Sequence, residues 1–418
     1  MSANWQHTDG RLDFAQPFLT HTAYNDRNED LVTAKLDATL SHNVQLFIKP
    51  YYHSWRSHYT EFDNTIPPSD QLIIIEDNGP WGYKDYGANV LAKLQFDPRL
   101  EYFVGYDVQS YGGNDAVLVI TQHNETTNAL FAQIRTTPAL LSNVILAAGA
   151  RYSDPSVGQS ATVWNVSGRW DIGSSLFVRG QVGTAFRLPT AEELFANDPD
   201  DERGNPNLKP EESTNANLSV GQSHLGAAQL GWELIGFYRK ISNLIDYATF
   251  DPLTNQAVFG NVPGTVHTRG AQLALDLAPS AWISGHLDFT YNHSIDPSTE
   301  EQIALVPTNL LKASLDVHPQ IVPFGVTVAV NHVGTLIATG LWDGSESYGN
   351  YTVVDLNGRY FIGEQRRQRI DLSVQNLFDH RYASRLGSGV RDFDGSSYTY
   401  WDLGVPLTVR LAYTYLFQ

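Results

Sequence analysis

One short acidic segment has side chains that could bind a metal ion. Residues 197–202 read NDPDDE, so Asp198, Asp200, Asp201 and Glu202 offer the carboxylate oxygens that Ca²⁺ prefers. The segment lacks the glycine and glutamate spacing of an EF-hand loop. An acidic loop tip exposed to water is the simpler interpretation, and we predict neither a metal site nor a cofactor.

The sequence contains no pattern typical of a catalytic site. Its 13 histidines are scattered, and His53 and His58 lie on opposite faces of one expected strand. We find no G-x-S-x-G elbow, no P-loop and no paired-carboxylate arrangement. We therefore predict that the chain is not an enzyme.

Aromatic and arginine side chains lie in or beside the connections that we expect to be long. Aromatic rings provide a large contact area at small entropic cost, and arginine pairs with anionic groups. About half of these rings would instead serve at the edge of a membrane. The residues that we predict to contact a ligand are Trp81, Tyr83, Arg187, Arg203, Trp342, Tyr348, Arg385, Arg391 and Tyr398.

The elements that position these side chains alternate between apolar and polar residues. The segment LTVRLAYTYLF places large apolar or aromatic side chains at every second position from Leu407 to Phe417. The positions between them carry mostly small or polar residues such as Arg410. Residues 370–375 and 286–292 repeat this pattern. A period of two with one apolar face describes a strand between two different solvents.

Composition limits the possible classes of protein. The chain has 418 residues, no cysteine, 42% hydrophobic residues and a formal charge of −18, with no change of texture that would mark a domain boundary. No apolar run approaches the roughly 20 residues of a membrane helix. The acidic balance argues against nucleic acid as a partner. The aromatic content of 12% suits the girdles of a transmembrane barrel, and we expect one domain over residues 1–418.

The connections between the expected strands alternate between short and long, with 155–159 as the exception. The short ones lie at 41–43, 97–99, 137–143, 172–174, 278–280, 318–323 and 364–365, and the long ones at 11–29, 64–82, 113–125, 188–212, 250–256, 295–307, 336–350 and 383–399. Such sorting places all long loops at one end of the sheet. This asymmetry is typical of outer-membrane β-barrels, with short periplasmic turns and long extracellular loops.

We therefore predict an all-β, antiparallel transmembrane β-barrel with about 18 visible strands. Two of them, 227–249 and 257–278, are about twice as long as the ~9–11 residues needed for crossing, so their outer halves should project as a hairpin. The strands are expected near 3–10, 30–42, 44–60, 83–96, 100–112, 126–137, 144–154, 160–172, 174–187, 213–223, 227–249, 257–278, 281–294, 308–318, 324–335, 351–363, 366–382 and 400–417.

Two segments carry a resemblance to a known family. GTAFRLPTAEELF at 183–195 and GNPNLKPEES at 204–213 resemble the most recognisable motif pair in the barrel of TonB-dependent outer-membrane receptors, and DLSVQNLFDHRYAS at 371–384 supports the match. Proline and glycine here serve backbone geometry, so we favour a structural role for the pair over ligand contact by Arg187 or Arg203. The matching motif residues are Phe186, Arg187, Pro189, Gly204, Asn205, Pro206, Pro210 and the terminal aromatic Phe417.

The sequence departs from the family pattern at its N-terminal side. We expect the plug domain, the TonB box and the signal peptide to be absent, and the visible strands fall short of the family's barrel of about 22. The plug and the first strands would be deleted, separate or naturally missing. Contact with TonB would then occur only through a plug that this chain does not contain.

The resemblance implies the outer membrane of a Gram-negative bacterium and uptake of a scarce nutrient, such as a ferric siderophore or a related metal chelate. The expected partners are outer-membrane lipid or lipopolysaccharide and a small-molecule ligand, with no nucleic acid. A passive porin-like or engineered diffusion channel is the main alternative. An enzyme active at the rim of the barrel is the third.

Overall fold

The structure is a computed structural model in which nearly every regular element is a β-strand. It describes residues 1–15, 21–63, 73–77, 81–116, 118–199, 201–226, 229–297, 300–341, 344–363, 366–390 and 396–416. Within these ranges no helix is long and apolar enough to cross a membrane, and α1 (Ala191–Phe195) has five residues. Nineteen strands belong to one sheet, which agrees with the predicted all-β class and its 18 strands plus the short β4.

The chain divides into two compact units by its internal contacts. One unit comprises residues 1–167, 183–214 and 241–264, and the other comprises 168–182, 215–240 and 265–418. Four strands contribute residues to both: β9 (Ala161–Ile172), β10 (Leu176–Arg187), β12 (Glu211–Leu225) and β13 (Leu230–Ser242).

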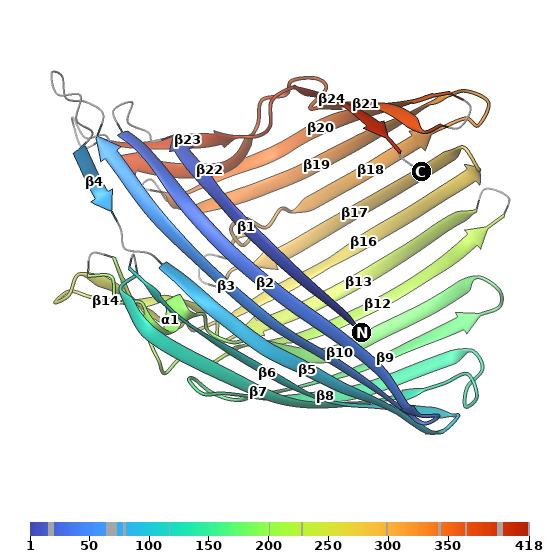
Figure 1. Cartoon of the computed structure of the whole chain (residues 1–418), viewed down its shortest axis with the longest axis horizontal. Helices are drawn as coiled ribbons and strands as arrows, with labels where there is room; N and C mark the ends of the chain where they lie inside the picture. The colour runs from blue at the N-terminus through green and yellow to red at the C-terminus, as the bar shows by residue number, and fades with distance from the viewer. Residues whose placement is uncertain are drawn as a thin grey trace. The chain divides into compact units, whose positions relative to one another are not determined.

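The first unit is an antiparallel meander, in which each main strand pairs with the next one along the chain (Figure 1). β4 pairs with the end of β3. The strands are β1 (Ser2–Ala15), β2 (His21–Ser41), β3 (Val44–Asp63), β4 (Ile73–Asp77), β5 (Trp81–Asp97), β6 (Leu100–Asp115), β7 (Ile120–Thr136) and β8 (Val144–Pro155).

The second unit repeats this meander from β16 to β21, and β24 then pairs with β21. The hairpin of β22 and β23 lies between β21 and β24 in sequence and forms a separate two-stranded sheet. The strands are β16 (Thr265–Ser280), β17 (Ile283–Ile295), β18 (Asn309–Val317), β19 (Phe324–Leu341), β20 (Gly344–Ile362), β21 (Gln368–Gln375), β22 (Ala383–Val390), β23 (Ser397–Leu403) and β24 (Thr408–Tyr415).

The two faces of the sheet differ as the alternation predicts. On β24, Val409, Leu411 and Tyr413 are 62%, 72% and 60% exposed, although all three are large apolar or aromatic side chains. A row of large apolar side chains on the outside of a barrel is expected to contact lipid. We therefore call this face of the sheet the lipid-facing side, and we call the opposite, polar face the lumen-facing side. Few large side chains are buried, because the sheet is a single layer.

Two predicted strands are wrong in length. The segment 227–249 is broken after β13 at Asn243, whose φ is +56°, and the segment 257–278 is broken before β16 at Gly264, whose φ is +118°. The outer pieces, β14 (Ile245–Asp251) and β15 (Gln256–Asn261), do form the expected hairpin. This hairpin is a separate sheet with the two-residue strand β11 (Glu202–Arg203), which is parallel to β15.

Several expected long connections are themselves largely strand. β1 and β2 continue into 11–29, β19 and β20 into 336–350, and the connection 383–399 contains the β22–β23 hairpin. The expected strand 366–382 ends at Gln375, and 400–417 divides into β23 and β24. The strands extend beyond the segments in which apolar and polar residues alternate. Outside a membrane the two faces of a strand need not differ in polarity, so the backbone can stay paired without that pattern.

Asn376 ends β21 and ties the following loop to its neighbours. It is 1% exposed and has a φ of +49°. Its side chain donates to the carbonyl oxygens of His380 and Val405 at 2.9 Å and accepts from the amide of His380 at 2.9 Å. Its own amide donates to Asp355 at 2.8 Å. The side chain thus satisfies backbone groups that have no partner within a strand.

We predict that Asn376→Ala lowers the free energy of unfolding by about 2–4 kcal/mol, because three hydrogen bonds of a buried side chain are lost. Equilibrium unfolding in urea, followed by tryptophan fluorescence in detergent micelles, measures this. Asn357→Ala, at an exposed position of β20, is the control and should change little. Equal stability of both variants would contradict the assigned role.

Candidate functional site

The FRLPT segment leads from β10 into α1 through a capping box. The amide of Glu193 donates to the hydroxyl of Thr190 at 3.2 Å, and the amide of Thr190 donates to the carboxylate of Glu193 at 2.7 Å. Pro189 precedes the cap and cannot donate to the sheet. The reciprocal bonds satisfy amides that the first turn of a helix leaves free.

Arg187 joins this helix to the start of β12. Its guanidinium donates to Glu193 at 2.9 and 3.0 Å and to Glu211 at 2.8 Å twice. The carboxylate of Glu211 also accepts the amide of Ile245 at 3.0 Å. Five charge-assisted bonds thus hold the strand end, the helix and the start of the β14–β15 hairpin together.

The GNPNLKPE segment packs against the same helix. Gly204 donates its amide to the carbonyl of Ala196 at 2.7 Å, and a Cβ at Gly204 would lie 2.5 Å from the amide nitrogen of Phe195. The side chain of Asn205 accepts from the amide of Asn207 at 3.0 Å and donates to the carbonyl of Phe259 at 3.2 Å. Pro206 and Pro210 flank the loop that follows.

A small apolar core explains why these bonds converge. Leu194, Leu208 and Phe259 are 1%, 1% and 8% exposed, and Val157 and Ile245 pack around them. The motif pair therefore assembles a loop core from α1, the 204–210 loop and the β14–β15 hairpin. Its contacts support the structural role that we favoured, and Phe186 lies at the end of β10 within the same segment.

The other predicted ligand residues are distributed over separate places. Arg203 pairs with Asp251 at 3.1 Å, and Tyr348 packs against the buried core of Ala338, Ala383 and Leu386. Tyr398 and Arg385 lie on the β22–β23 hairpin. Arg385 is exposed, whereas the ring of Tyr398 covers Gly389. Trp342, Arg391 and Phe417 lie outside the described residues.

Trp81 and Tyr83 begin β5 on its lumen-facing side and belong to a cluster that the sequence did not predict. The ring of Tyr83 lies 5.7 Å from that of Trp55 on β3, its direct cross-strand partner. The guanidinium of Arg27 on β2 lies 4.9 Å from the centre of the Trp55 ring and pairs with Glu29 at 3.1 Å. Trp81 lies two residues before Tyr83 on the same face of β5. We call Arg27, Trp55, Trp81 and Tyr83 the aromatic cluster.

Ion pairs continue along the lumen-facing side of the first unit. Glu101 is 7% exposed and pairs with Lys93 at 2.7 Å and with Arg135. Asp107 pairs with Arg151. Sequence reasoning missed these pairs because the partners lie on different strands, although charges at alternate positions were the available signal.

Several carboxylates lie close to one another near α1. Partial burial and the nearby charges of Glu202, Glu193 and Asp115 raise the pKa of the Glu192 carboxyl above its ordinary value. The hydroxyl of Tyr247 donates to Glu202, and burial together with this bond raises the pKa of Tyr247. Within the described ranges, no three histidine, aspartate or glutamate side chains are placed to hold a metal ion.

Comparison with known proteins decides the family. The family model described as "TonB dependent receptor-like, beta-barrel" matches residues 2–377. The chain belongs to this family. Its members are outer-membrane proteins of Gram-negative bacteria, and this agrees with the alternating strands and with the motif pair.

Proteins similar to this chain in sequence include vitamin B12 transporters. The chain is 26% identical over 232 residues to BtuB of Photobacterium profundum, covering 55% of this chain and 36% of that protein. It is 24% identical over 312 residues to BtuB of Vibrio vulnificus, covering 71% of this chain and 46% of that protein. The chain therefore spans less than half the length of these relatives.

Solved structures of the same fold have other ligands in their names. The copper transporter OprC has a TM-score of 0.71 and 13% identity, covering 99% of this chain and 74% of that one. The ferric-catecholate import receptor Fiu from E. coli K12 has a TM-score of 0.70 and 11% identity, covering 94% and 64%. At such identities the likeness shows the fold alone.

We predict that Arg187→Ala destabilises the loop core by about 1–3 kcal/mol. The change leaves two largely buried carboxylates unpaired, and the partial exposure of Arg187 reduces the cost below that of a fully buried pair. Limited proteolysis of the folded protein should then cleave within 188–212 faster.

Arg99→Ala is the matched control, because the Arg99–Asp97 pair is exposed on both sides, at 59% and 39%. It should leave the proteolysis pattern unchanged. A rate of cleavage in Arg187→Ala equal to that of the unchanged protein would show that Arg187 does not hold the loop core.

Proposed function

We propose that this chain forms the barrel wall of an outer-membrane receptor that takes up a scarce nutrient, a metal chelate. The match of the family model to residues 2–377 is the observation that carries the proposal. The names of the relatives and of the similar structures, which mention vitamin B12, copper and ferric catecholate, support a metal-containing cargo.

The aromatic cluster is the contact surface that we assign to the ligand. Trp55, Trp81 and Tyr83 are all half-buried; Trp81 and Tyr83 begin β5, and Trp55 lies opposite Tyr83 on β3. Arg27 already pairs with Glu29, so its role is to hold the Trp55 ring by a cation–π contact. The rings supply apolar area with hydroxyl and indole groups, which suits a large polar chelate.

Exposed arginine supplies charge for an anionic chelate. Arg385 has no ion pair or hydrogen bond within the described part of the chain, so its guanidinium is available to a ligand. Arg187 and Arg203, by contrast, are engaged within the protein. We keep Tyr348, Tyr398, Trp342 and Arg391 as proposed contacts.

Energy for uptake would come from TonB through a plug in the complete receptor. A passive diffusion channel is the competing function, and the two differ in one measurable property. A receptor binds its ligand tightly, whereas a channel conducts steadily and binds weakly.

We predict that Trp55→Ala and Tyr83→Ala each weaken ligand binding by about 1–3 kcal/mol, or about 5- to 150-fold, because each removes a ring from the contact surface. Isothermal titration calorimetry of the purified chain would use three probes, cyanocobalamin and the ferric complexes of a tris-catecholate and a tris-hydroxamate.

Trp164→Ala is the control, since Trp164 is 45% exposed on β9 and lies outside the aromatic cluster. It should bind like the unchanged protein. If none of the three probes binds and the chain conducts steadily in a planar bilayer, the receptor function is wrong. If a probe binds but both cluster variants retain full affinity, only the assigned site is wrong.

A further inference from the structure

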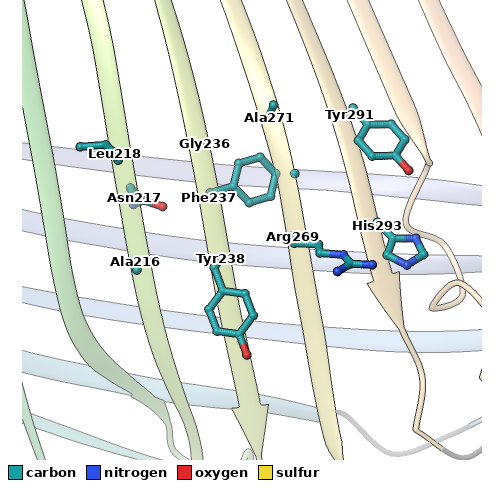
Figure 2. Close-up of a pocket in the computed structure, with 11 residues that line it drawn as sticks. Ala216, Asn217, Leu218, Gly236, Phe237, Tyr238, Arg269, Ala271, Tyr291 and His293 are labelled. Atoms are coloured by element: carbon teal, nitrogen blue, oxygen red, sulfur yellow. The ribbon is translucent and has the colours of Figure 1, made fainter.

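A groove of about 780 Å³ lies across four neighbouring strands of the second unit (Figure 2). Its floor consists of small residues, Ala216 on β12, Gly236 on β13 and Ala271 on β16. A Cβ at Gly236 would approach nothing closer than 4.0 Å, so the space above it is open. The groove is open because each of three adjacent strands contributes a small residue to its floor.

The groove is on the lipid-facing side of the sheet. Ala271 is the cross-strand partner of Tyr291, and the same row continues as Leu273 opposite Phe289. Leu218, Tyr238 and Tyr291, which form its walls, are 65%, 42% and 50% exposed. The alternate positions face the other way: Glu233 on β13 pairs with Arg179 on β10. The residues of the groove floor therefore face the acyl chains of lipid molecules.

Basic side chains lie at one end of this apolar groove. Arg269 and His293 are direct cross-strand partners, and Figure 2 shows the guanidinium extending toward the imidazole. Lys240 follows Tyr238 by two residues on the same face of β13. Within the described part of the chain, none of these three side chains has a hydrogen bond or ion pair.

These three basic side chains lie near the loop ends of their strands. Arg269 lies four residues after the start of β16, and His293 lies two residues before the end of β17, where the connection 296–308 begins. The hydroxyl of Tyr238 bonds to His267 at 2.8 Å at the same level, as girdle residues do. This is the level of the outer leaflet's headgroups if long connections are extracellular.

An unpaired cation on the lipid-facing side is costly within the hydrocarbon and favourable beside an anionic headgroup. Arg269 with Lys240 offers planar and point-like donors, the combination that binds phosphate. The apolar floor and walls beneath them fit a saturated chain attached to the same molecule.

We propose that this groove binds a phosphorylated, acylated glycolipid of the outer leaflet, the lipid A part of lipopolysaccharide. Arg269, Lys240 and His293 contact a phosphate, and an acyl chain lies over Ala216, Gly236 and Ala271. The inference rests on the transmembrane fold and is independent of the nutrient that the receptor takes up.

Photo-crosslinking from the groove wall tests this. A benzoylphenylalanine in place of Leu218 in the full chain, in detergent micelles with added diphosphoryl lipid A, should give a lipid cross-link. Arg269→Gln with Lys240→Gln should reduce its yield at least fivefold, because the phosphate loses both donors. Gly236→Leu should reduce it by filling the floor, at a position that accepts a side chain.

Arg410→Gln is the control for charge, because Arg410 lies on the other face of β24 from Val409 and Leu411. It should leave the yield unchanged, with all variants keeping their heat-modifiable migration. The proposal is wrong if the double variant cross-links as well as the unchanged protein or if fully dephosphorylated lipid A cross-links equally. The proposal is also wrong if the same benzoylphenylalanine variant, irradiated in outer membranes, cross-links to a protein instead of to a lipid.

Discussion

Pairing of backbone groups between strands is the constraint on which the rest of this structure depends. A chain in lipid has no water to satisfy its amides and carbonyls, so every residue within the bilayer must bond to a neighbouring strand. The meander from β1 to β8 and from β16 to β21 achieves this with antiparallel partners that follow one another in sequence. The side chains are then sorted by a single rule, alternation between lipid and lumen.

The same rule determines where polar chemistry can occur. On the lumen-facing side, charges such as Glu101 and Asp107 find partners on adjacent strands, which makes the wall stable around water. At the loop ends the alternation is relaxed, and additional structure forms from side-chain caps, as Arg187 and Asn376 show. On the lipid-facing side Arg269 is unpaired among the described residues, and a charge in that position is informative.

The period of two and the order of short and long connections were sufficient to predict the fold class and nearly all strands. They failed at Asn243 and Gly264, where single residues of positive φ divide long extended segments in two. Two members of the aromatic cluster, Trp81 and Tyr83, were predicted as ligand contacts because they lie beside an expected long connection. Trp55 was not predicted, because it lies within a strand and meets Tyr83 only through cross-strand pairing. The groove requires the registers of four strands, which no single segment encodes.

The assignment of the two faces is tested most directly by cysteine labelling of β16. The chain contains no cysteine, so single substitutions give a clean signal. With the protein in lipid vesicles, cysteine at Gln272, Ala274 or Asp276 should react with a water-soluble maleimide, whereas cysteine at Leu273 or Leu275 should react slowly. Equal rates at all five positions would contradict a strand between lipid and a water-filled lumen.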